Sequence, residues 1–213
     1  TFAQDTADEY QLTREAQDNY SIESLRRAQA AIADGAFVSE IVPVTVATRK
    51  GDVVVDTDEQ PGKGMPEKIP TLRPAFAKDG TITAATSSSI SDGAAAVVLT
   101  KASIAEAKGH KPVAKIVAHA AHAQEPKDFT VAPVGAINKL LAKAGWSIGD
   151  VDLFEVNEAF AAVPMRFMKE MGVPHDKVNV NGGAIALGHP LGATGVRLMT
   201  TMLNELERTG GRY

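Results

Sequence analysis

The sequence predicts an α/β fold in which helices cover a sheet. The hydrophobic fraction of 44% and the charged fraction of 23% are those of an ordinary globular protein. In the second half of the chain, short apolar runs that are typical of strands alternate with helical patterns. Several of these helical patterns end at a glycine, as helices commonly do. Together these observations favour a layered arrangement of strands and helices.

The first predicted helix covers residues 13–34. Thr13 can cap its N-terminus, apolar residues recur at near-helical spacing, and Gly35 follows its end. Two strands are predicted next, at 41–46 and 53–55, with Pro43 placing the first of them at an edge or a bulge. Residues 57–80 are rich in proline and glycine, which predicts a long irregular loop.

Beyond Asp92 the predicted strands and helices alternate. The predicted strands cover residues 94–99, 113–118, 151–156 and 178–180. The predicted helices cover residues 101–108, 133–144 and 192–208, and glycine ends each of them. A further helix is expected after 151–156, with Asn157 as its cap. This order predicts a sheet sandwiched by helices.

Charge and composition exclude several classes of protein. The formal net charge is −4 and no long basic block is present, so we expect no nucleic-acid partner. No apolar run is long enough to span a membrane, so we expect no membrane contact. The absence of cysteine excludes disulfides and cysteine metal sites. The first residues lack the pattern of a signal peptide, and the expected location is cytoplasmic.

The segment Asn157-Glu158-Ala159-Phe160 follows the predicted strand at 151–156. The end of a strand in an open α/β sheet is a common place for residues that bind ligands. A purely structural interpretation is also open, in which Asn157 caps the next helix and Glu158 complements its dipole. The local spacing alone favours the structural interpretation.

The stretch at 179–197 is rich in glycine around the dipeptide His189-Pro190. Pro190 disfavours helical geometry at His189, and Gly188 allows backbone and ligand to approach closely. The next predicted helix begins near Gly192 and offers free N–H groups to an anion. A histidine held here could act as a general base or stabilise an oxyanion, or it could be a structural residue in a glycine-rich loop.

Other patterns predict no metal and no bound cofactor. His119 and His122 suggest a metal site, but the sequence shows no third ligand, and we interpret both as structural or surface residues. The phosphate loop and the dinucleotide fingerprint are absent, and nothing predicts a flavin or a nicotinamide. The polar run at 86–93 is explained as a turn, although its hydroxyl groups could also contact a ligand.

Together these segments resemble the thiolase family. The runs at 157–161 and 179–197 match two signatures of that family in order and in separation. Shorter matches occur at 40–44, 72–76 and 91–96, so the resemblance covers the whole chain.

The resemblance implies the layered αβαβα thiolase fold. Under it, residues 1–90 are most of the loop domain, 91–111 are the last strand and helix of the N-terminal domain, and 112–213 are an incomplete C-terminal domain.

The resemblance also implies an activity and roles for individual residues. Thiolases cleave 3-ketoacyl-CoA with CoA, or condense two acetyl-CoA, with one cysteine as nucleophile and a second that moves a proton. His189 matches the histidine that activates the nucleophile and faces the thioester oxygen, and Asn157 matches the asparagine that holds a water at that site. The expected residues of the CoA and acyl site are Ser88, Phe129, Phe160 and Gly188. CoA is a substrate here, and the complete enzyme is expected to be a dimer or tetramer.

Two departures from the family follow from the same comparison. Both family cysteines are expected outside these 213 residues, so we expect the full-length parent to be a thiolase and this chain alone to be inactive. Residues 57–70 lack the arginine that stacks on the CoA adenine in some relatives, and Lys63 is the nearest basic candidate.

Three functions remain in competition. The favoured one is an acetyl-CoA C-acetyltransferase, because the Phe129 region and the compact length favour acetoacetyl-CoA. The sequence at 186–192 instead favours a broad-chain degradative 3-ketoacyl-CoA thiolase of fatty acid metabolism. A non-catalytic CoA- or acyl-binding protein on a thiolase scaffold is the third, and the presence of both Asn157 and His189 argues against it.

Overall fold

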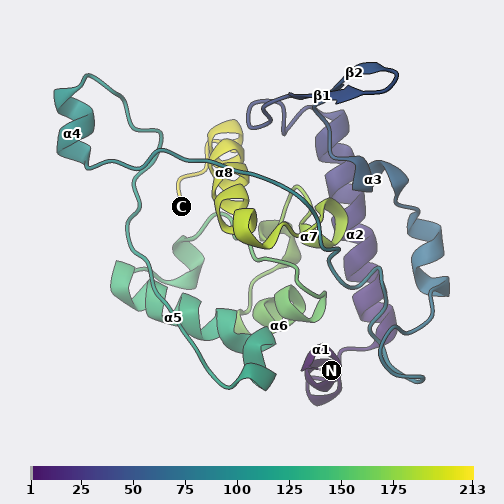
Figure 1. Cartoon of the computed structure of the whole chain (residues 1–213). Coiled ribbons are helices and arrows are strands. Elements are labelled where there is room, and N and C mark those ends of the chain that lie inside the picture. The colour runs from purple at the N-terminus through teal and green to yellow at the C-terminus, as the bar shows by residue number, and fades with distance from the viewer. Residues whose placement is uncertain (1) are drawn as a thin grey trace.

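The computed structural model describes residues 2–213, which form a mainly helical body with one small hairpin (Figure 1). The α-helices are α1 (Phe2–Glu9), α2 (Arg14–Ala33), α3 (Glu59–Lys63), α4 (Ala102–Ala107), α5 (Ala132–Ala144), α6 (Ala162–Met171), α7 (Ala184–Leu187) and α8 (Leu191–Thr209). The shorter 3-10 helices are η1 (Pro66–Thr71), η2 (Pro126–Val131), η3 (Ile148–Asp150) and η4 (His175–Lys177). The strands are β1 (Val44–Thr48) and β2 (Gly51–Val55).

Helices α2, α5 and α8 confirm the predictions made for 13–34, 133–144 and 192–208. At the start of α2, the Thr13 hydroxyl accepts a hydrogen bond from the backbone N–H of Ala16 at 3.1 Å, as an N-cap does. Gly145 and Gly210 end α5 and α8 in the left-handed conformation, with φ of 71° and 73°. Helix α4 confirms the short helix predicted at 101–108.

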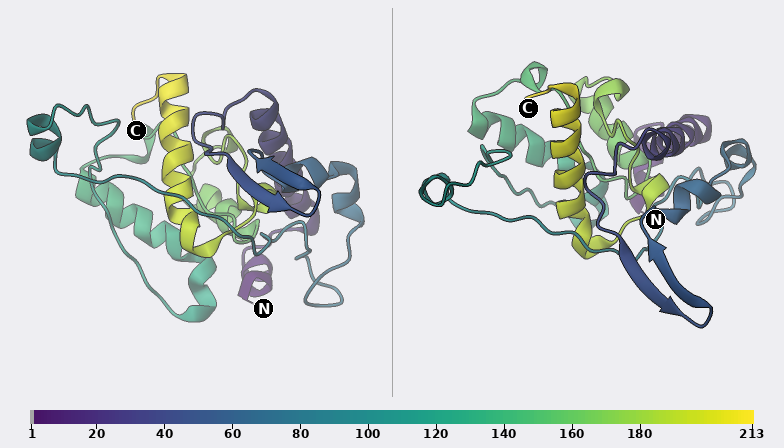
Figure 2. Two further views of the ribbon diagram at one scale, coloured as in Figure 1. Left: turned by 45° about the horizontal axis from the view of Figure 1, so that its top comes forward. Right: turned by 90° about the horizontal axis from the view of Figure 1, so that it is seen from above.

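The two strands predicted at 41–46 and 53–55 form an antiparallel hairpin with slightly shifted bounds. Val44 pairs with Val55, and Thr48 pairs with Gly51 across the turn. The hairpin begins directly after Pro43, because proline lacks the N–H that a ladder needs. Every residue of both strands is exposed, and the hairpin projects from the body (Figure 2). The region 57–80, predicted as irregular, contains α3 and η1.

The predicted strands at 94–99 and 113–118 are wrong. These segments run outward to α4 and back as long unpaired traces (Figure 1), and within residues 2–213 no strand pairs with them. Their apolar side chains are open to solvent, with Val98 96% and Val113 80% exposed. The apolar pattern marks segments suited to a sheet, but a strand forms only when a neighbour supplies the hydrogen bonds.

The predicted strands at 151–156 and 178–180 meet in only one bridge. Phe154 and Val178 lie parallel, with the N–H of Asn179 donating to the Phe154 carbonyl at 2.9 Å. This contact nevertheless lies in the largest apolar cluster, where α5 and α6 pack over buried Phe154, Phe167 and Val178. The ring centroids of Phe154 and Phe167 are 5.3 Å apart.

Helix α2 joins the remaining parts of the body. Leu25 and Ala28 of α2 pack with Ile69 of η1 and Ala186 of α7 in a second apolar cluster. The glycine-rich loop approaches so closely that a Cβ at Gly182 would lie 2.6 Å from the Ser24 carbonyl oxygen. The chain therefore needs glycine where this loop crosses α2. No helix within residues 2–213 is both long enough and apolar enough to cross a membrane.

The first testable prediction concerns the core under α6. Phe167 is fully buried, so Phe167→Ala should lower the free energy of unfolding by about 3–5 kcal/mol through lost apolar burial and a residual cavity. Chemical denaturation measures this value. Met199→Ala, at a position 51% exposed on α8, is the matched control and should change it by less than about 0.5 kcal/mol. Equal effects of the two variants would contradict this description of the core.

Candidate active site

The residues singled out in the sequence come together around the segment 87–90. Ser87 bridges Phe160 in antiparallel fashion, and Ile90 bridges His189 in parallel fashion. The backbone N–H of Ser88 donates to the Ala159 carbonyl at 3.1 Å. This short segment therefore lies between the two signature segments and holds them side by side.

Asn157 and His189 face each other across this site. Asn157 Nδ2 and His189 Nε2 are 3.4 Å apart, although the two residues are 32 positions apart in sequence. The interpretation of Asn157 as a helix cap is wrong, because α6 begins at Ala162 and is preceded by Ala161. The Oδ1 atom of Asn157 is buried and makes no hydrogen bond within residues 2–213. The Asn157 amide is thus directed at the site rather than at a helix end.

The dipole role considered for Glu158 is also wrong. Its side chain lies away from the N-terminus of α6 and is completely buried, with 0% of its surface exposed. The carboxylate accepts hydrogen bonds from side chains of α2 and from the glycine-rich loop. The Glu158 carboxylate is therefore held by residues far away in sequence, and not by the N-terminus of the helix that follows it.

Thr194, in the first turn of α8, fixes the proton on the His189 ring. The Thr194 hydroxyl donates to the Pro190 carbonyl at 2.9 Å, so its oxygen is left to accept from His189 Nδ1 at 2.8 Å. In the neutral ring the proton then lies on Nδ1, and the free lone pair of Nε2 faces Asn157. An imidazole in this tautomer is ready to take a proton at Nε2.

The electrostatic surroundings keep the His189 ring neutral. Burial lowers the pKa of His189 below its usual value of 6.5, and the positive charge of Arg197 lowers that pKa further. Arg197 Nη1 lies 3.6 Å from Glu155 Oε2, behind the Asn157 segment. Burial also raises the pKa of Glu155 to about 8, while Arg197 opposes that rise. His189 is therefore an unprotonated base at neutral pH.

Aromatic rings form one wall beside this pair. The ring of Phe160 meets those of Phe129 and Phe76 edge to face, with centroids 6.5 Å apart in each case. Phe129 and Asn157 also line an open cavity of about 240 Å³. Phe129 and Phe160 lie together as the sequence predicted. Phe76 was missed as a site residue, although the matched run at 72–76 contains it.

Gly188 has a steric reason to be glycine. Its φ is +96°, and a Cβ at this position would lie 2.3 Å from the Ser91 hydroxyl oxygen. Glycine thus lets the segment 89–91 pack against the backbone that leads into His189. The expected contacts of Gly188 and Ser88 with CoA stay predictions.

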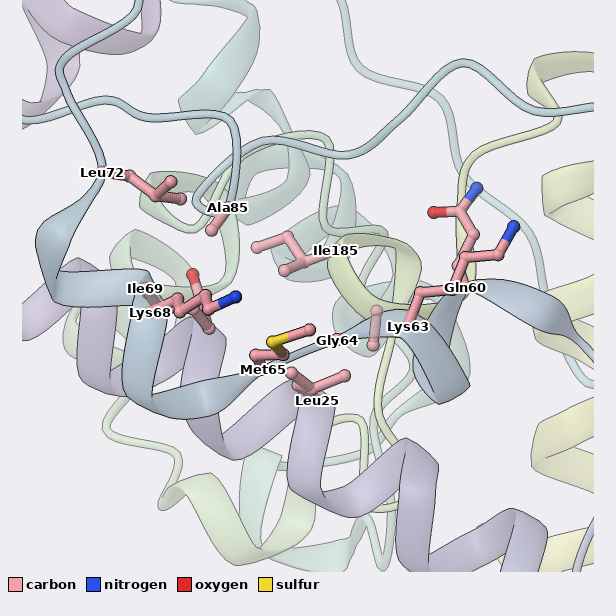
Figure 3. Close-up of a pocket in the computed structure, with 12 residues that line it drawn as sticks. Leu25, Gln60, Lys63, Gly64, Met65, Lys68, Ile69, Leu72, Ala85 and Ile185 are labelled. Carbon is pink, nitrogen blue, oxygen red and sulfur yellow. The ribbon is translucent and has the colours of Figure 1, made fainter.

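A second cavity, of about 300 Å³, lies between α2 and the segment from α3 to η1 (Figure 3). Lys63 and Lys68 bring positive charge to its lining, and Leu25 and Met65 bring apolar surface. Ile185, four residues before His189, also lines it. This cavity therefore approaches the loop that carries the histidine.

The two histidines considered as metal ligands do not form a metal site. His122 Nε2 lies 2.9 Å from Gln124 Oε1, and among residues 2–213 no cluster of potential ligands is large enough to hold a metal ion.

A neutral histidine beside an amide group can act as a general base, and both groups can donate hydrogen bonds to developing negative charge. The chain belongs to the thiolase family. Residues 1–103 match the family model described as the thiolase N-terminal domain, and residues 110–213 match that of the thiolase C-terminal domain. Both matches confirm the resemblance seen in the sequence.

Curated relatives and solved structures agree with this assignment. The cytosolic acetyl-CoA acetyltransferase of Mus musculus is 50% identical over 212 residues, which are 98% of this chain and 53% of that protein. The acetyl-CoA acetyltransferase of Shinella zoogloeoides is 46% identical over 213 residues, or 100% of this chain and 54% of that protein. The chain thus spans about half the length of the relatives it matches.

The crystal structure of the Bacillus anthracis acetyl-CoA acetyltransferase has a TM-score of 0.95 at 41% identity, over 99% of this chain and 54% of that one. A thiolase from Ascaris suum in complex with coenzyme A has a TM-score of 0.88 at 42% identity, over 96% of this chain and 53% of that one. These scores confirm the predicted thiolase fold. The division at 1–90, 91–111 and 112–213 stays a prediction.

The second testable prediction concerns the His189 ring. Thr194→Val removes the hydroxyl that accepts from Nδ1, so the neutral ring should lose its preference for the proton on that nitrogen. Ring ¹⁵N chemical shifts of histidine-labelled protein measure the tautomer. Thr194→Ser is the control and should keep the parent spectrum. A parent ring whose neutral form carries its proton on Nε2 would contradict this geometry.

Proposed function

We propose that the full-length protein containing this chain is an acetyl-CoA C-acetyltransferase. The observation that carries the proposal is the 3.4 Å approach of Asn157 Nδ2 to His189 Nε2, in a chain about half identical to named acetyl-CoA acetyltransferases. Such an enzyme cleaves acetoacetyl-CoA with CoA, or condenses two acetyl-CoA in the reverse direction. CoA is its substrate, and the proposal requires no further cofactor.

In the proposed reaction, His189 Nε2 removes the proton of a nucleophilic cysteine thiol that lies outside these residues. The resulting thiolate attacks the 3-keto carbon of acetoacetyl-CoA, and negative charge develops on the carbonyl oxygen. The bond between C2 and C3 then breaks, and negative charge passes to the thioester oxygen of the departing acetyl-CoA, where the Nε2–H of His189 and a water held by Asn157 stabilise it. The departing acetyl-CoA takes a proton from a second cysteine. CoA thiol then accepts the enzyme-bound acetyl group and gives its proton to that second cysteine, while His189 Nε2 returns its proton to the nucleophilic cysteine.

The cavity of Figure 3 is the proposed site for the phosphate-bearing end of CoA. Lys63 and Lys68 supply cations for phosphate groups, and Met65 and Leu72 supply apolar surface nearby. We propose that Ser88 and the Phe129–Phe160 pair contact the pantetheine and acyl groups, supported by the bridges of segment 87–90 to Phe160 and His189.

The proposed location follows the names of two relatives. We propose a cytoplasmic enzyme, supported by the cytosolic acetyl-CoA acetyltransferases of Mus musculus and Rattus norvegicus at 50% and 49% identity. We also propose a homodimer or homotetramer. The unpaired segments 93–101 and 109–121 carry exposed valine, leucine and isoleucine, and further strands of the full-length protein would cover them.

A broad-chain 3-ketoacyl-CoA thiolase of fatty acid metabolism is the second candidate. The human mitochondrial 3-ketoacyl-CoA thiolase has a TM-score of 0.90, but it is only 35% identical to this chain. Rates on acetoacetyl-CoA and on a long-chain 3-ketoacyl-CoA separate the two. Our proposal expects the higher kcat/KM with acetoacetyl-CoA, and the opposite order would establish the second candidate.

The third testable prediction uses the full-length protein with acetoacetyl-CoA and CoA. His189→Ala should lower kcat by roughly 10²- to 10⁴-fold, because both the base and an oxyanion donor are lost. Glu207→Ala, at an exposed position on α8, is the control and should leave kcat within about twofold of the parent. A His189→Ala variant with near-parent turnover would refute the proposed mechanism. A parent protein without turnover would favour the non-catalytic binding protein.

The fourth prediction concerns the 213-residue chain by itself. Because it contains no cysteine, the isolated chain should show no thiolysis of acetoacetyl-CoA. The denatured intact mass must first show that the sample is the 22.4 kDa chain. Turnover by a sample of that mass would contradict the cysteine mechanism.

A further inference from the structure

The carboxylate of Glu158 is completely buried and accepts four hydrogen bonds. Oε1 accepts from the Tyr20 hydroxyl at 2.7 Å and from Asn179 Nδ2 at 2.9 Å. Oε2 accepts from the Ser24 hydroxyl at 2.8 Å and from the backbone N–H of Ile185 at 3.1 Å. All four neighbours are donors, so the site is built for a group that only accepts.

The four donors come from two separate parts of the chain. Tyr20 and Ser24 are one helical turn apart on α2, whereas Asn179 and Ile185 flank the start of the glycine-rich loop. The Ser24 hydroxyl makes two hydrogen bonds here, because it donates to Glu158 and its oxygen accepts from the Gly183 N–H at 3.1 Å. The carboxylate therefore fastens α2, the Asn157 segment and the glycine-rich loop to one point.

The groups around the Glu158 carboxylate are packed so tightly that it can hardly move. A Cβ at Gly183 would lie 2.2 Å from the carboxyl carbon of Glu158, so only glycine allows the loop to come this close. Asn179 braces the other side, with Oδ1 accepting from the Val156 N–H at 2.8 Å and Nδ2 donating to the Val156 carbonyl at 2.8 Å. Burial, and next the negative charge of Glu158, raise the pKa of Tyr20 well above its usual value, so its hydroxyl stays a donor.

We propose that Glu158 is a positioning residue that sets the separation of Asn157 and His189. It adjoins Asn157 in sequence, and its bond to Ile185 holds the single turn of α7 that leads to His189. A buried carboxylate left without its donors is costly, so the three segments stay together. The effect on catalysis rests on the proposed thiolase function, whereas the effect on geometry does not.

The test begins with Glu158→Gln in the full-length protein. Whichever way the glutamine amide turns, its NH₂ group faces an N–H donor that cannot accept, either Asn179 Nδ2 or the backbone N–H of Ile185. One hydrogen bond of the carboxylate is therefore lost, and the segments can no longer be held as before. We expect kcat for acetoacetyl-CoA thiolysis to fall roughly 10- to 100-fold. The KM for CoA should stay within about twofold, because Lys63 and Lys68 lie on α3 and η1, whereas the donors to Glu158 lie on α2 and in the glycine-rich loop. Glu207→Gln, at an exposed position on α8, is the matched control and should change neither value.

Two variants on α2 test the hydrogen bonds to Glu158 without altering the segments that carry Asn157 and His189. Tyr20→Phe keeps the ring that stacks on His175 at 4.8 Å and removes one donor. Ser24→Ala removes the hydroxyl that serves both Glu158 and Gly183. Each should lower kcat by a smaller factor than Glu158→Gln, and Tyr20→Phe should add little once Glu158 is already glutamine. These variants keep the proposal testable even where Glu158→Gln does not fold.

Crystal structures of the parent, Glu158→Gln and Tyr20→Phe give a readout that needs no turnover. The proposal expects the distance from Asn157 Nδ2 to His189 Nε2 to lengthen from 3.4 Å in the variants. An unchanged distance together with parent-like kcat would overturn it, as would a loss of thermal stability alone. If the parent shows no thiolysis, the proposed function fails, and the crystallographic distance still decides the positioning role.

Discussion

The rest of the structure depends on burying the Glu158 carboxylate without leaving any of its hydrogen bonds unmade. A charge removed from water is tolerated only when donors surround it, and here they come from α2 and from both sides of the glycine-rich loop. That requirement brings together residues up to 138 positions apart. The segment that follows Glu158 and the loop that ends at His189 are then fixed relative to each other.

Glycine makes this close packing possible. Three glycines of the glycine-rich loop each allow a different part of the chain to come close. Gly182 meets the backbone of α2, Gly183 meets the Glu158 carboxylate, and Gly188 meets the Ser91 hydroxyl. A side chain at any of the three would push neighbouring groups apart. The abundance of glycine around His189 therefore has a structural cause that is separate from the room a thioester requires.

Local signals in the sequence predicted the helices well and the strands poorly. Thr13, Gly145 and Gly210 mark helix ends through short-range hydrogen bonds, and α2, α5 and α8 form where they indicate. Strand pairing depends on distant segments, so 94–99 has the right pattern without a partner in residues 2–213. The pairing of Asn157 with His189 followed from the family signatures. The contacts that Glu158 and Thr194 make were missed because their partners come close only once the chain is folded.

The measurement that tests the account most directly is a crystal structure of the full-length protein with acetyl-CoA bound. The account predicts that the thioester oxygen lies within hydrogen-bond distance of His189 Nε2, about 3 Å away, with a water on Asn157 completing the site. The adenosine phosphates should lie near Lys63 and Lys68. An acetyl group bound away from His189, with that ring still paired to Asn157 and Thr194, would contradict the account.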